Sequence, residues 1–280
     1  MAHDSVGSSS VSGAHRTLLC VHAHPDDEAI FTAGATMLYA ERSYRIVLIT
    51  CTNGRLGIDQ NNHGGNHSEH DPIWTVATRA RELSVAAQMV GVTRHIQLGY
   101  DDSGMAGWPQ NAEPDSFVAT PVDTVAAKIL AVIEEEQPEV VLTYDERGFY
   151  GHPDHIHAHQ ATMAAVKQSA SVERLYYPVI PQLARQEVRN LAQQGGLSMP
   201  AWVTTAKGTP DNLVSTSLPT APYSERKRAA IAAHASQTDN AEIVALAPLL
   251  FENLFGREFY QRGWSRREAL NDQTDLFGGI

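Results

Sequence analysis

Residues 18–28 read LLCVHAHPDDE and carry two structural signals in one short stretch. Leu18 to Val21 form an apolar run, which predicts a buried strand. The run ends at a turn-like His-Pro-Asp-Asp sequence, and Glu28 to Arg42 then has the apolar spacing of a helix. Ile46 to Cys51 is a second apolar run, so this region predicts a β-α-β unit with parallel strands and a right-handed crossover.

The alternation of strands and helices continues along the chain. Helices and strands are predicted in turn, beginning with a helix, at Thr75–Val90, His95–Leu98, Val122–Glu135, Glu139–Thr143, Pro153–Ser169 and Arg174–Tyr177. Such alternation is typical of a sheet that is covered by helices on both faces. We therefore expect an α/β, Rossmann-like fold with a mostly parallel sheet.

The two ends of the chain depart from this pattern. Residues 1–15 are rich in Ser and Gly and lack an apolar core, which predicts a disordered tail rather than a secretory signal. Residues 16–280 contain no clear linker and are expected to form one domain, with a less regular C-terminal part from about 180 to 280. Helices are predicted in that part at Ser224–His234 and Ile243–Phe255.

Composition excludes some classes of function. The chain has 280 residues and a net charge of −11, and nucleic-acid phosphates need clustered Lys and Arg, so we expect no nucleic-acid partner. No stretch of ~18 consecutive apolar residues is present, so we expect no membrane span. Cys20 and Cys51 lie in predicted strands and are expected to be buried free thiols, in keeping with a cytoplasmic protein. The oligomeric state is not indicated.

Two long polar loops follow predicted strands, at residues 53–73 and 99–120. Loops of this length in a compact domain are usually functional or disordered. Ligands of open α/β sheets bind outside the carboxyl ends of the strands. Both loops therefore mark the edge of the sheet at which we expect the site.

The first motif that carries chemistry is His24 to Glu28, HPDDE, at the end of the first predicted strand. His and carboxylate side chains are the usual nitrogen and oxygen ligands of Zn²⁺. A catalytic zinc site uses three protein ligands and needs a base near the attacking water. Two adjacent carboxylates can divide these tasks, since one can bind the metal while its neighbour takes the proton.

The second motif is Tyr150 to His159, YGHPDHIHAH, which opens the predicted helix after the strand Glu139–Thr143. Pro153 suits the first turn of a helix, which places His155 and His159 one turn apart and His152 at the helix start. Any one of these three can complete a metal site. Either motif alone is most simply a helix cap, but two such motifs at strand-to-helix junctions favour a metal centre.

Together, His24–Glu28 and His152–His155 resemble the paired motifs of the LmbE-like, or phosphatidylinositol-glycan class L, zinc deacetylases. The resemblance extends from about Thr17 to Gln237. Within this family the chain is similar to the actinobacterial mycothiol-pathway enzymes, including at Thr143–Asp145 and Ala233–Gln237. The resemblance implies a Rossmann-like sheet with a metal site at the carboxyl ends of the strands.

The resemblance also implies the metal site and its base. His24, Asp27 and His155 would bind Zn²⁺, and Fe²⁺ could occupy the same ligands. Asp26 would be the general base. The reaction would be hydrolysis of the linear amide bond of an N-acyl amino sugar.

The remaining site residues are implied in the same way. His152 would be a protonated partner that stabilises the oxyanion or protonates the leaving amine, a role for which Asp26 is the alternative. Asp154 would orient His152. Tyr150 would polarise the amide carbonyl. Arg79 and Asp102 would contact substrate hydroxyls or an inositol-like group.

Three acylated amino sugars compete as the substrate. Asp102–Gly107 resembles the deacetylase of N-acetylglucosaminyl-inositol, whereas Thr274–Phe277 resembles the amidase of mycothiol S-conjugates. An antibiotic-pathway amino sugar is the third candidate, because Ala29–Gly34, Gly57–Pro72 and Trp108–Asp115 depart from the mycothiol pattern. These signals favour the first substrate.

Two other classes of protein stay open on the residues alone. A metal phosphoesterase uses similar Asp and His ligands but often binds two metals, and only three good ligands are evident. A sugar-binding module without activity would lack a ligand or the base, whereas Asp26, His152 and Tyr150 are all present.

Overall fold

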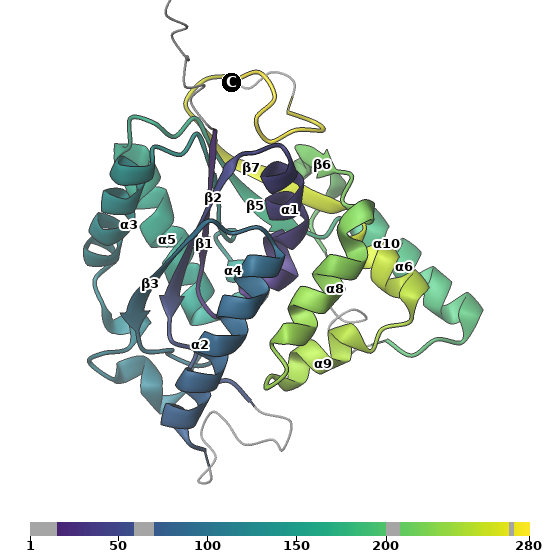
Figure 1. The fold of residues 1–280 in the computed structure, drawn as a ribbon, viewed down its shortest axis with the longest axis horizontal. Helices are drawn as coiled ribbons and strands as arrows, with labels where there is room; N and C mark the ends of the chain where they lie inside the picture. Colours follow the sequence, from purple (N-terminus) through teal and green to yellow (C-terminus); the bar gives the residue numbers. More distant parts are fainter. Residues whose placement is uncertain (1–15, 59–69, 200–207, 269–271) are drawn as a thin grey trace, which may run out of the picture.

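The computed structural model describes residues 16–58, 70–199, 208–268 and 272–280 (Figure 1). The expected disordered tail, residues 1–15, lies outside these ranges, as does most of the loop expected at 53–73. The described strands form one sheet in the order β3-β2-β1-β4-β5-β7-β6. Their bounds are β1 Thr17–His22, β2 Arg45–Thr52, β3 Arg94–Tyr100, β4 Val140–Leu142, β5 Arg174–Val179, β6 Thr216–Leu218 and β7 Glu258–Ser265.

The first five strands are parallel, which confirms the expected Rossmann-like arrangement. β1 lies between β2 and β4 and is buried along its whole length. Burial on both faces explains why its sequence is a continuous apolar run rather than an alternating one. β7 runs antiparallel to β5, and β6 runs antiparallel to β7, so both strands of the C-terminal part extend the same sheet.

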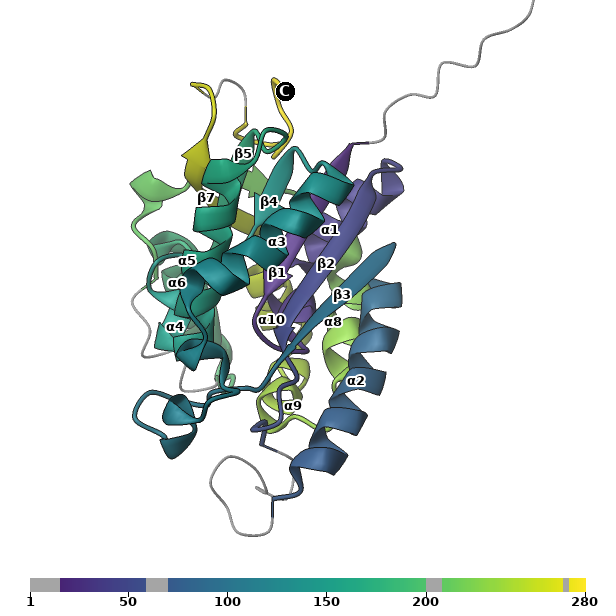
Figure 2. The same ribbon diagram turned by 90° about the vertical axis from the view of Figure 1, so that its left-hand side faces the viewer.

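Helices cover both faces of the sheet (Figures 1 and 2). The helices are α1 Ala33–Glu41, α2 Pro72–Met89, α3 Val122–Glu136, α4 Gly148–Gly151, α5 Pro153–Gln168, α6 Gln182–Gly195, α8 Ser224–Ala233, α9 Thr238–Val244 and α10 Pro248–Phe255. Single turns are the π-helix η1 Glu28–Thr32 and the 3₁₀ turns η2 Pro109–Ala112, η3 Phe117–Ala119, η4 Asp211–Leu213 and η5 Ala221–Tyr223.

Alternate residues of a strand point to opposite faces of the sheet, and β1 follows this rule. Leu19 and Val21 belong to one apolar cluster with side chains of α3 and α5. Leu18 and Cys20 belong to another, which includes side chains of α1 and α2. The two clusters therefore pack against opposite faces of β1, which fixes the position of its carboxyl end.

The C-terminal part differs from the sequence prediction in one respect. A single helix was expected over Ile243–Phe255, but α9 ends at Val244 and α10 begins at Pro248. Proline lacks the backbone N–H of a helix interior and disfavours helical backbone in the residue before it, so it starts α10 instead of continuing α9. α6, β6 and β7 were not predicted.

A buried ion pair connects this C-terminal part to the start of α1. The Glu258 carboxylate on β7 accepts hydrogen bonds from the backbone N–H groups of Gly34 (2.7 Å) and Ala35 (2.8 Å). Lys227 on α8 donates to the same carboxylate at 2.6 Å. Glu258 thus satisfies free donors at a helix N-terminus, where a negative charge is favourable.

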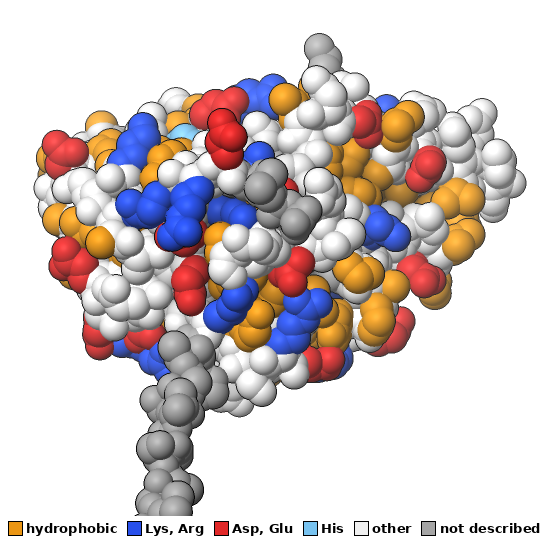
Figure 3. Space-filling view, turned by 90° about the horizontal axis from the view of Figure 1, so that it is seen from above, with side chains coloured by type: hydrophobic (Ala, Val, Ile, Leu, Met, Phe, Trp, Pro, Cys, Tyr) orange, Lys and Arg blue, Asp and Glu red, His pale blue; other side chains and the backbone are white. Residues whose placement is uncertain are grey.

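The end of the molecule where β1 begins carries both signs of charge, interspersed with apolar side chains (Figure 3). Arg45 and Arg94, at the first residues of β2 and β3, both bind Glu136. Within the described ranges, no helix has the length and apolar character needed to cross a lipid bilayer.

Candidate metal and catalytic site

The predicted site residues converge beyond the carboxyl ends of β1, β3 and β4. His24 follows β1, Asp102 follows β3, and Tyr144 follows β4, while His152 caps the start of α5. In the sheet order β3-β2-β1-β4-β5, the direction of strand order reverses between β1 and β4. Open α/β sheets bind ligands at such a switch point, because the loops on either side diverge there.

Three side chains have the spacing of ligands around one metal ion. His24 Nδ1 lies 3.5 Å from Asp27 Oδ2 and 3.3 Å from His155 Nε2, which lies 3.6 Å from Asp27 Oδ1. Ligand atoms about 2.1 Å from a tetrahedral zinc ion lie about 3.4 Å apart. All three residues are buried, and His24 and His155 also belong to a metal-compatible cluster with His152. The donor set therefore fits zinc.

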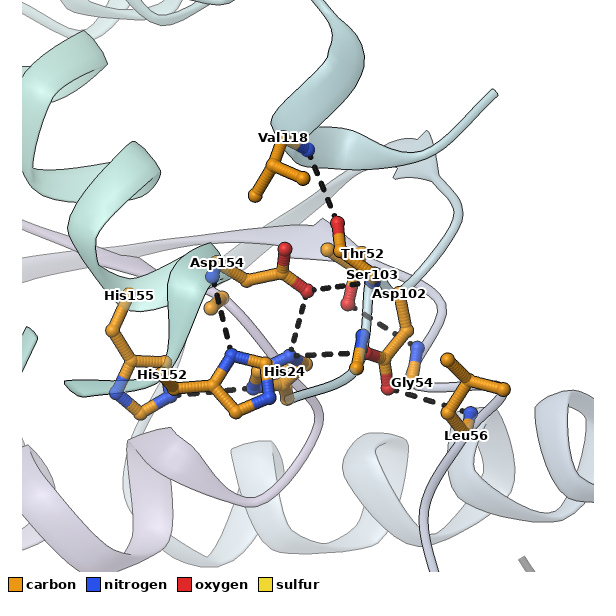
Figure 4. Close-up of polar contacts among 12 residues, drawn as sticks. His24, Thr52, Gly54, Leu56, Asp102, Ser103, Val118, His152, Asp154 and His155 are labelled. Carbon is orange, nitrogen blue, oxygen red and sulfur yellow. Dashed lines mark hydrogen bonds and ion pairs between the residues drawn. The ribbon is translucent and has the colours of Figure 1, made fainter. Parts of the chain in front are cut away.

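In each of the two histidines, the ring nitrogen that does not belong to the triangle has a hydrogen-bond partner, and the partner of His24 is seen in Figure 4. His24 Nε2 lies 3.1 Å from Asp154 Oδ2, and His155 Nδ1 lies 3.2 Å from the carbonyl of Gly148. Each acceptor holds the ring proton on its own side. The lone pairs then belong to His24 Nδ1 and His155 Nε2, the arrangement that metal-binding histidines use.

His159 was an alternative ligand and is not part of this cluster. Its Nδ1 lies 2.9 Å from the carbonyl of Tyr144, one helical turn beyond His155. His70, in the loop before α2, contacts the carbonyl of Arg55 instead of a metal site. His63 and His67 lie outside the described residues.

Tyr144 supports the cluster, a role that the sequence did not suggest. Its hydroxyl donates to Asp27 Oδ2 at 2.6 Å and accepts from the Ala23 N–H at 2.8 Å. Its ring stacks on His155 with a centroid distance of 4.0 Å. One buried side chain thus orients both the carboxylate of Asp27 and the ring of His155. The available signal was its place directly after β4, matching that of His24 after β1.

Asp26 has an unusual backbone conformation, with φ of 118°. A residue with a side chain pays about 1–3 kcal/mol to occupy such a region. The turn leads into η1, a π-helical turn, and such turns are often found at functional sites. Burial raises the pKa of Asp26 to about 6, although Arg79 opposes the shift. A carboxylate that titrates near neutrality suits a general base.

The guanidinium of Arg79 makes hydrogen bonds and an ion pair within the protein. It donates to the carbonyls of Gly54 (2.8 Å) and Pro25 and lies 3.2 Å from Asp26 Oδ2. Gly54 has φ of 63°, and a Cβ there would lie 2.6 Å from Arg79 Nη1. The expected substrate contact of Arg79 stays a prediction, because the residue also lines the cavity.

Asp154 was expected to orient His152. In the structure the Asp154 carboxylate accepts from His24 Nε2 and from the Ser103 N–H (3.0 Å), and it is the Asp154 backbone N–H that donates to His152 Nδ1, at 3.1 Å (Figure 4). Asp102 accepts from the Gly104 N–H at 2.8 Å and lies 3.6 Å from His24 Nε2. Asp154 therefore contacts both imidazoles, that of His24 through its carboxylate and that of His152 through its backbone N–H.

His152 and Tyr150 lie on the cavity side of the cluster. Burial and the neighbouring imidazoles of His24 and His155 lower the pKa of His152 to about 3, which favours a neutral ring. Tyr150 is 58% exposed, and its ring contacts that of His155 edge-on at 5.0 Å. Its neighbour Phe149 has φ of 65°, so the backbone there is also strained.

A cavity of about 720 Å³ opens over these residues. Its lining includes polar side chains such as Asp26, Arg79 and Asn240 and apolar ones such as Phe31 and Val179. The volume lies in the range of pockets that hold small molecules.

Residues 19–166, more than half of the chain, match the PIG-L family model, described as GlcNAc-PI de-N-acetylase. The chain belongs to the PIG-L family. The resemblance drawn from the two His-Pro-Asp motifs is therefore confirmed. His24, Asp27 and His155, called the metal triangle below, all lie inside the matched region.

Relatives of this PIG-L protein extend over nearly the whole chain. It is 36% identical over 289 residues, 95% of each chain, to the 1D-myo-inositol 2-acetamido-2-deoxy-alpha-D-glucopyranoside deacetylase of Acidothermus cellulolyticus. It is 39% identical to the protein of that name from Thermobifida fusca, over 94% of this chain and 99% of the relative. A solved structure, the N,N'-diacetylchitobiose deacetylase from Pyrococcus horikoshii, shares its fold, with TM-score 0.56, 19% identity and 85% and 76% coverage.

Proposed function

We propose that this PIG-L protein is a metal-dependent deacetylase that hydrolyses the acetamide of N-acetylglucosaminyl-inositol. The observation that carries this proposal is the buried triangle of His24, Asp27 and His155, of which His24 and Asp27 line the cavity together with Asp26. The substrate is supported by similarity to relatives of that name over 95% of the chain. Residues 16–280 would act as one deacetylase domain.

The metal would be held by the same triangle, and zinc is the first candidate, with Fe²⁺ as the alternative. When bound, the ion supplies a Lewis acid that polarises the amide carbonyl and makes the attacking water more acidic. Three protein ligands leave a position open for that chemistry. Tyr144, Asp154 and the carbonyl of Gly148 fix the ligand orientations.

Asp26 would perform both proton transfers. Its carboxylate takes a proton from the attacking water, whose oxygen forms the new bond to the carbonyl carbon. The protonated Asp26 then gives that proton to the nitrogen as the C–N bond breaks. The products are a free amine and acetate, and the base is regenerated.

His152 and Tyr150 would stabilise the oxygen that gains negative charge. His152 Nδ1 accepts the Asp154 N–H, so a neutral ring carries its proton on Nε2 and can donate it in a hydrogen bond. This neutral role replaces the protonated role that the resemblance implied. A donor of this kind is worth about 3 kcal/mol in the transition state.

The mycothiol S-conjugate is a weaker candidate than its sequence signal suggests. That signal was the tail Thr274–Phe277, and Phe277 is buried against Tyr39 and Tyr44, with ring centroids 5.0 and 4.9 Å away. Its backbone carbonyl also accepts from Arg16, which precedes β1. The tail therefore packs at the amino ends of the strands, away from the cavity.

The test is to load the protein with zinc, and separately with Fe²⁺, and to measure the amine released from N-acetylglucosaminyl-inositol and from a mycothiol S-conjugate. We expect faster cleavage of the acetyl sugar, with one metal ion per chain. Faster cleavage of the conjugate would make the protein an amidase of conjugates. A stoichiometry of two metals with no amine released would instead favour the phosphoesterase class.

A further inference from the structure

We infer that His234 and Asn240, in the C-terminal part of the chain, are positioning residues for the base Asp26. The inference rests on the proposed function, in which Asp26 moves the proton. Neither residue belongs to the metal triangle. They act on Asp26 through two separate contacts, one to its backbone and one to its carboxylate.

The backbone contact passes through Glu28. The Asp26 N–H donates to Glu28 Oε2 at 3.0 Å, within the turn that gives Asp26 its positive φ. The other oxygen, Glu28 Oε1, lies 2.7 Å from His234 Nε2. Glu28 is 1% exposed and His234 is fully buried, so neither group has water as an alternative partner.

His234 holds this buried carboxylate in place. A buried carboxylate oxygen without a hydrogen-bond partner is strongly unfavourable inside a protein. With His234 on Oε1, the other oxygen stays directed at the Asp26 N–H. Without His234, Oε1 would lose its partner, Glu28 would turn away, and the strained conformation of Asp26 would lose its support.

The side-chain contact comes from Asn240 on α9. Its Nδ2 donates to Asp26 Oδ2 at 3.2 Å, and Arg79 approaches the same oxygen at 3.2 Å. Both donors fix Oδ2, which leaves Oδ1 for the attacking water. Asn240 is 2% exposed and lines the cavity, so its amide is held rather than mobile.

The segment between these two residues is itself anchored to α2. Ser236 donates from its N–H and from its hydroxyl to Glu82, at 2.8 Å each. Glu82 lies one helical turn after Arg79 on the same helix. The Ala233–Gln237 motif therefore ties His234, and the start of α9 that carries Asn240, to the helix of Arg79.

The experiment compares kcat, KM, bound metal and thermal stability for the wild type, His234→Ala, His234→Gln and Asn240→Ala. We expect kcat to fall by about 100-fold in His234→Ala and about 10-fold in Asn240→Ala, with KM within about two-fold and one metal bound, because misplacing a catalytic group costs up to about this factor. Gln retains an N–H donor for Glu28, so His234→Gln should recover part of the loss.

Ile231→Ala is the matched control, because Ile231 is fully buried on α8 one turn before His234 and does not line the cavity. It should lower the thermal midpoint without lowering kcat. If the His234 and Asn240 variants behave like this control, or if they lose the metal, the positioning role is wrong.

Failure of the proposed function has a different signature. In that case the wild type itself releases no amine, and the kcat of a variant cannot be compared with that of the wild type. The crystal structure of His234→Ala then decides the inference. A retained φ near 118° at Asp26, with the carboxylate in place, overturns it, and a relaxed Asp26 supports it.

Discussion

The two junctions that build the site have nearly the same sequence, His-Pro-Asp-Asp after β1 and His-Pro-Asp-His at the start of α5. In both, the fourth residue, Asp27 or His155, is a proposed metal ligand. The third residues differ, because Asp154 is fully buried against His24 whereas Asp26 lines the cavity. The same letters thus yield a carboxylate that contacts His24 in one place and a cavity-lining carboxylate, the proposed base, in the other.

Backbone conformation is the cause of this difference. At the second junction, His152 caps α5 and Pro153 begins a regular α-helix, which turns Asp154 toward the protein. At the first junction, Asp26 has a positive φ and the chain enters a π-helical turn. The comparison teaches that the motif identifies the location of the site, while the type of helix that follows assigns the roles.

The largest expected effect is loss of the metal through the fourth residue of the second junction. His155→Ala should abolish stoichiometric metal binding and with it the activity, because one of three protein ligands is gone. His159→Ala is the matched control on the same helix and should keep its metal, since His159 contacts the carbonyl of Tyr144. Metal analysis after dialysis checks both, and a His155→Ala protein with one tightly bound metal would contradict the assignment.

The next effect separates the two third residues. Asp26→Asn should lower kcat by about 10³-fold while the metal stays bound, because the proton acceptor is removed but the ligands are intact. Steady-state kinetics combined with metal analysis measures this. Near-normal turnover with metal bound would show that another group is the base.

Asp154→Asn is the counterpart at the second junction and should behave differently. We expect metal affinity to fall by about 10- to 100-fold, since the partner of His24 Nε2 is weakened. Excess metal should restore the activity of Asp154→Asn, whereas it should not restore the activity of Asp26→Asn. A loss of kcat that saturating metal does not restore would put Asp154 among the groups that act on the substrate.

The smallest effect is expected at Pro153, the first residue of α5. Pro153→Ala should lower the free energy of unfolding by about 0.4–1 kcal/mol, because the unfolded chain gains freedom while the helix keeps its cap. Denaturant unfolding measures the change, and kcat should stay within about two-fold. A large loss of activity would mean that the proline shapes the site and not only the helix start.

The sequence allowed the parallel half of the fold to be predicted, because each element there has its own apolar spacing. β7 escaped prediction because its buried and half-buried residues alternate at only one end, so it lacks a continuous apolar run. α6 escaped because its residues are mostly polar, with few buried positions such as Val188.

The site residues also fall into those that the sequence predicted and those that it did not. The proposed ligands and Asp26 lie in two short motifs, so local reasoning found them. Tyr144, His234 and Asn240 touch residues that are 117, 206 and 214 positions away in the chain, and no spacing rule connects such pairs. Arg79 and Asp102 were named from resemblance, and their substrate contacts stay predictions.

The distribution of the site along the chain also orders events during protein synthesis. Every residue of the metal triangle, and the strands β1 to β4 that carry it, precedes the end of α5 at Gln168. His234 and Asn240 leave the ribosome much later. If the proposed roles hold, a nascent chain would present its three metal ligands early, whereas the two residues proposed to position Asp26 would follow with the last third of the polypeptide. Metal binding and the onset of hydrolysis would then be separate steps.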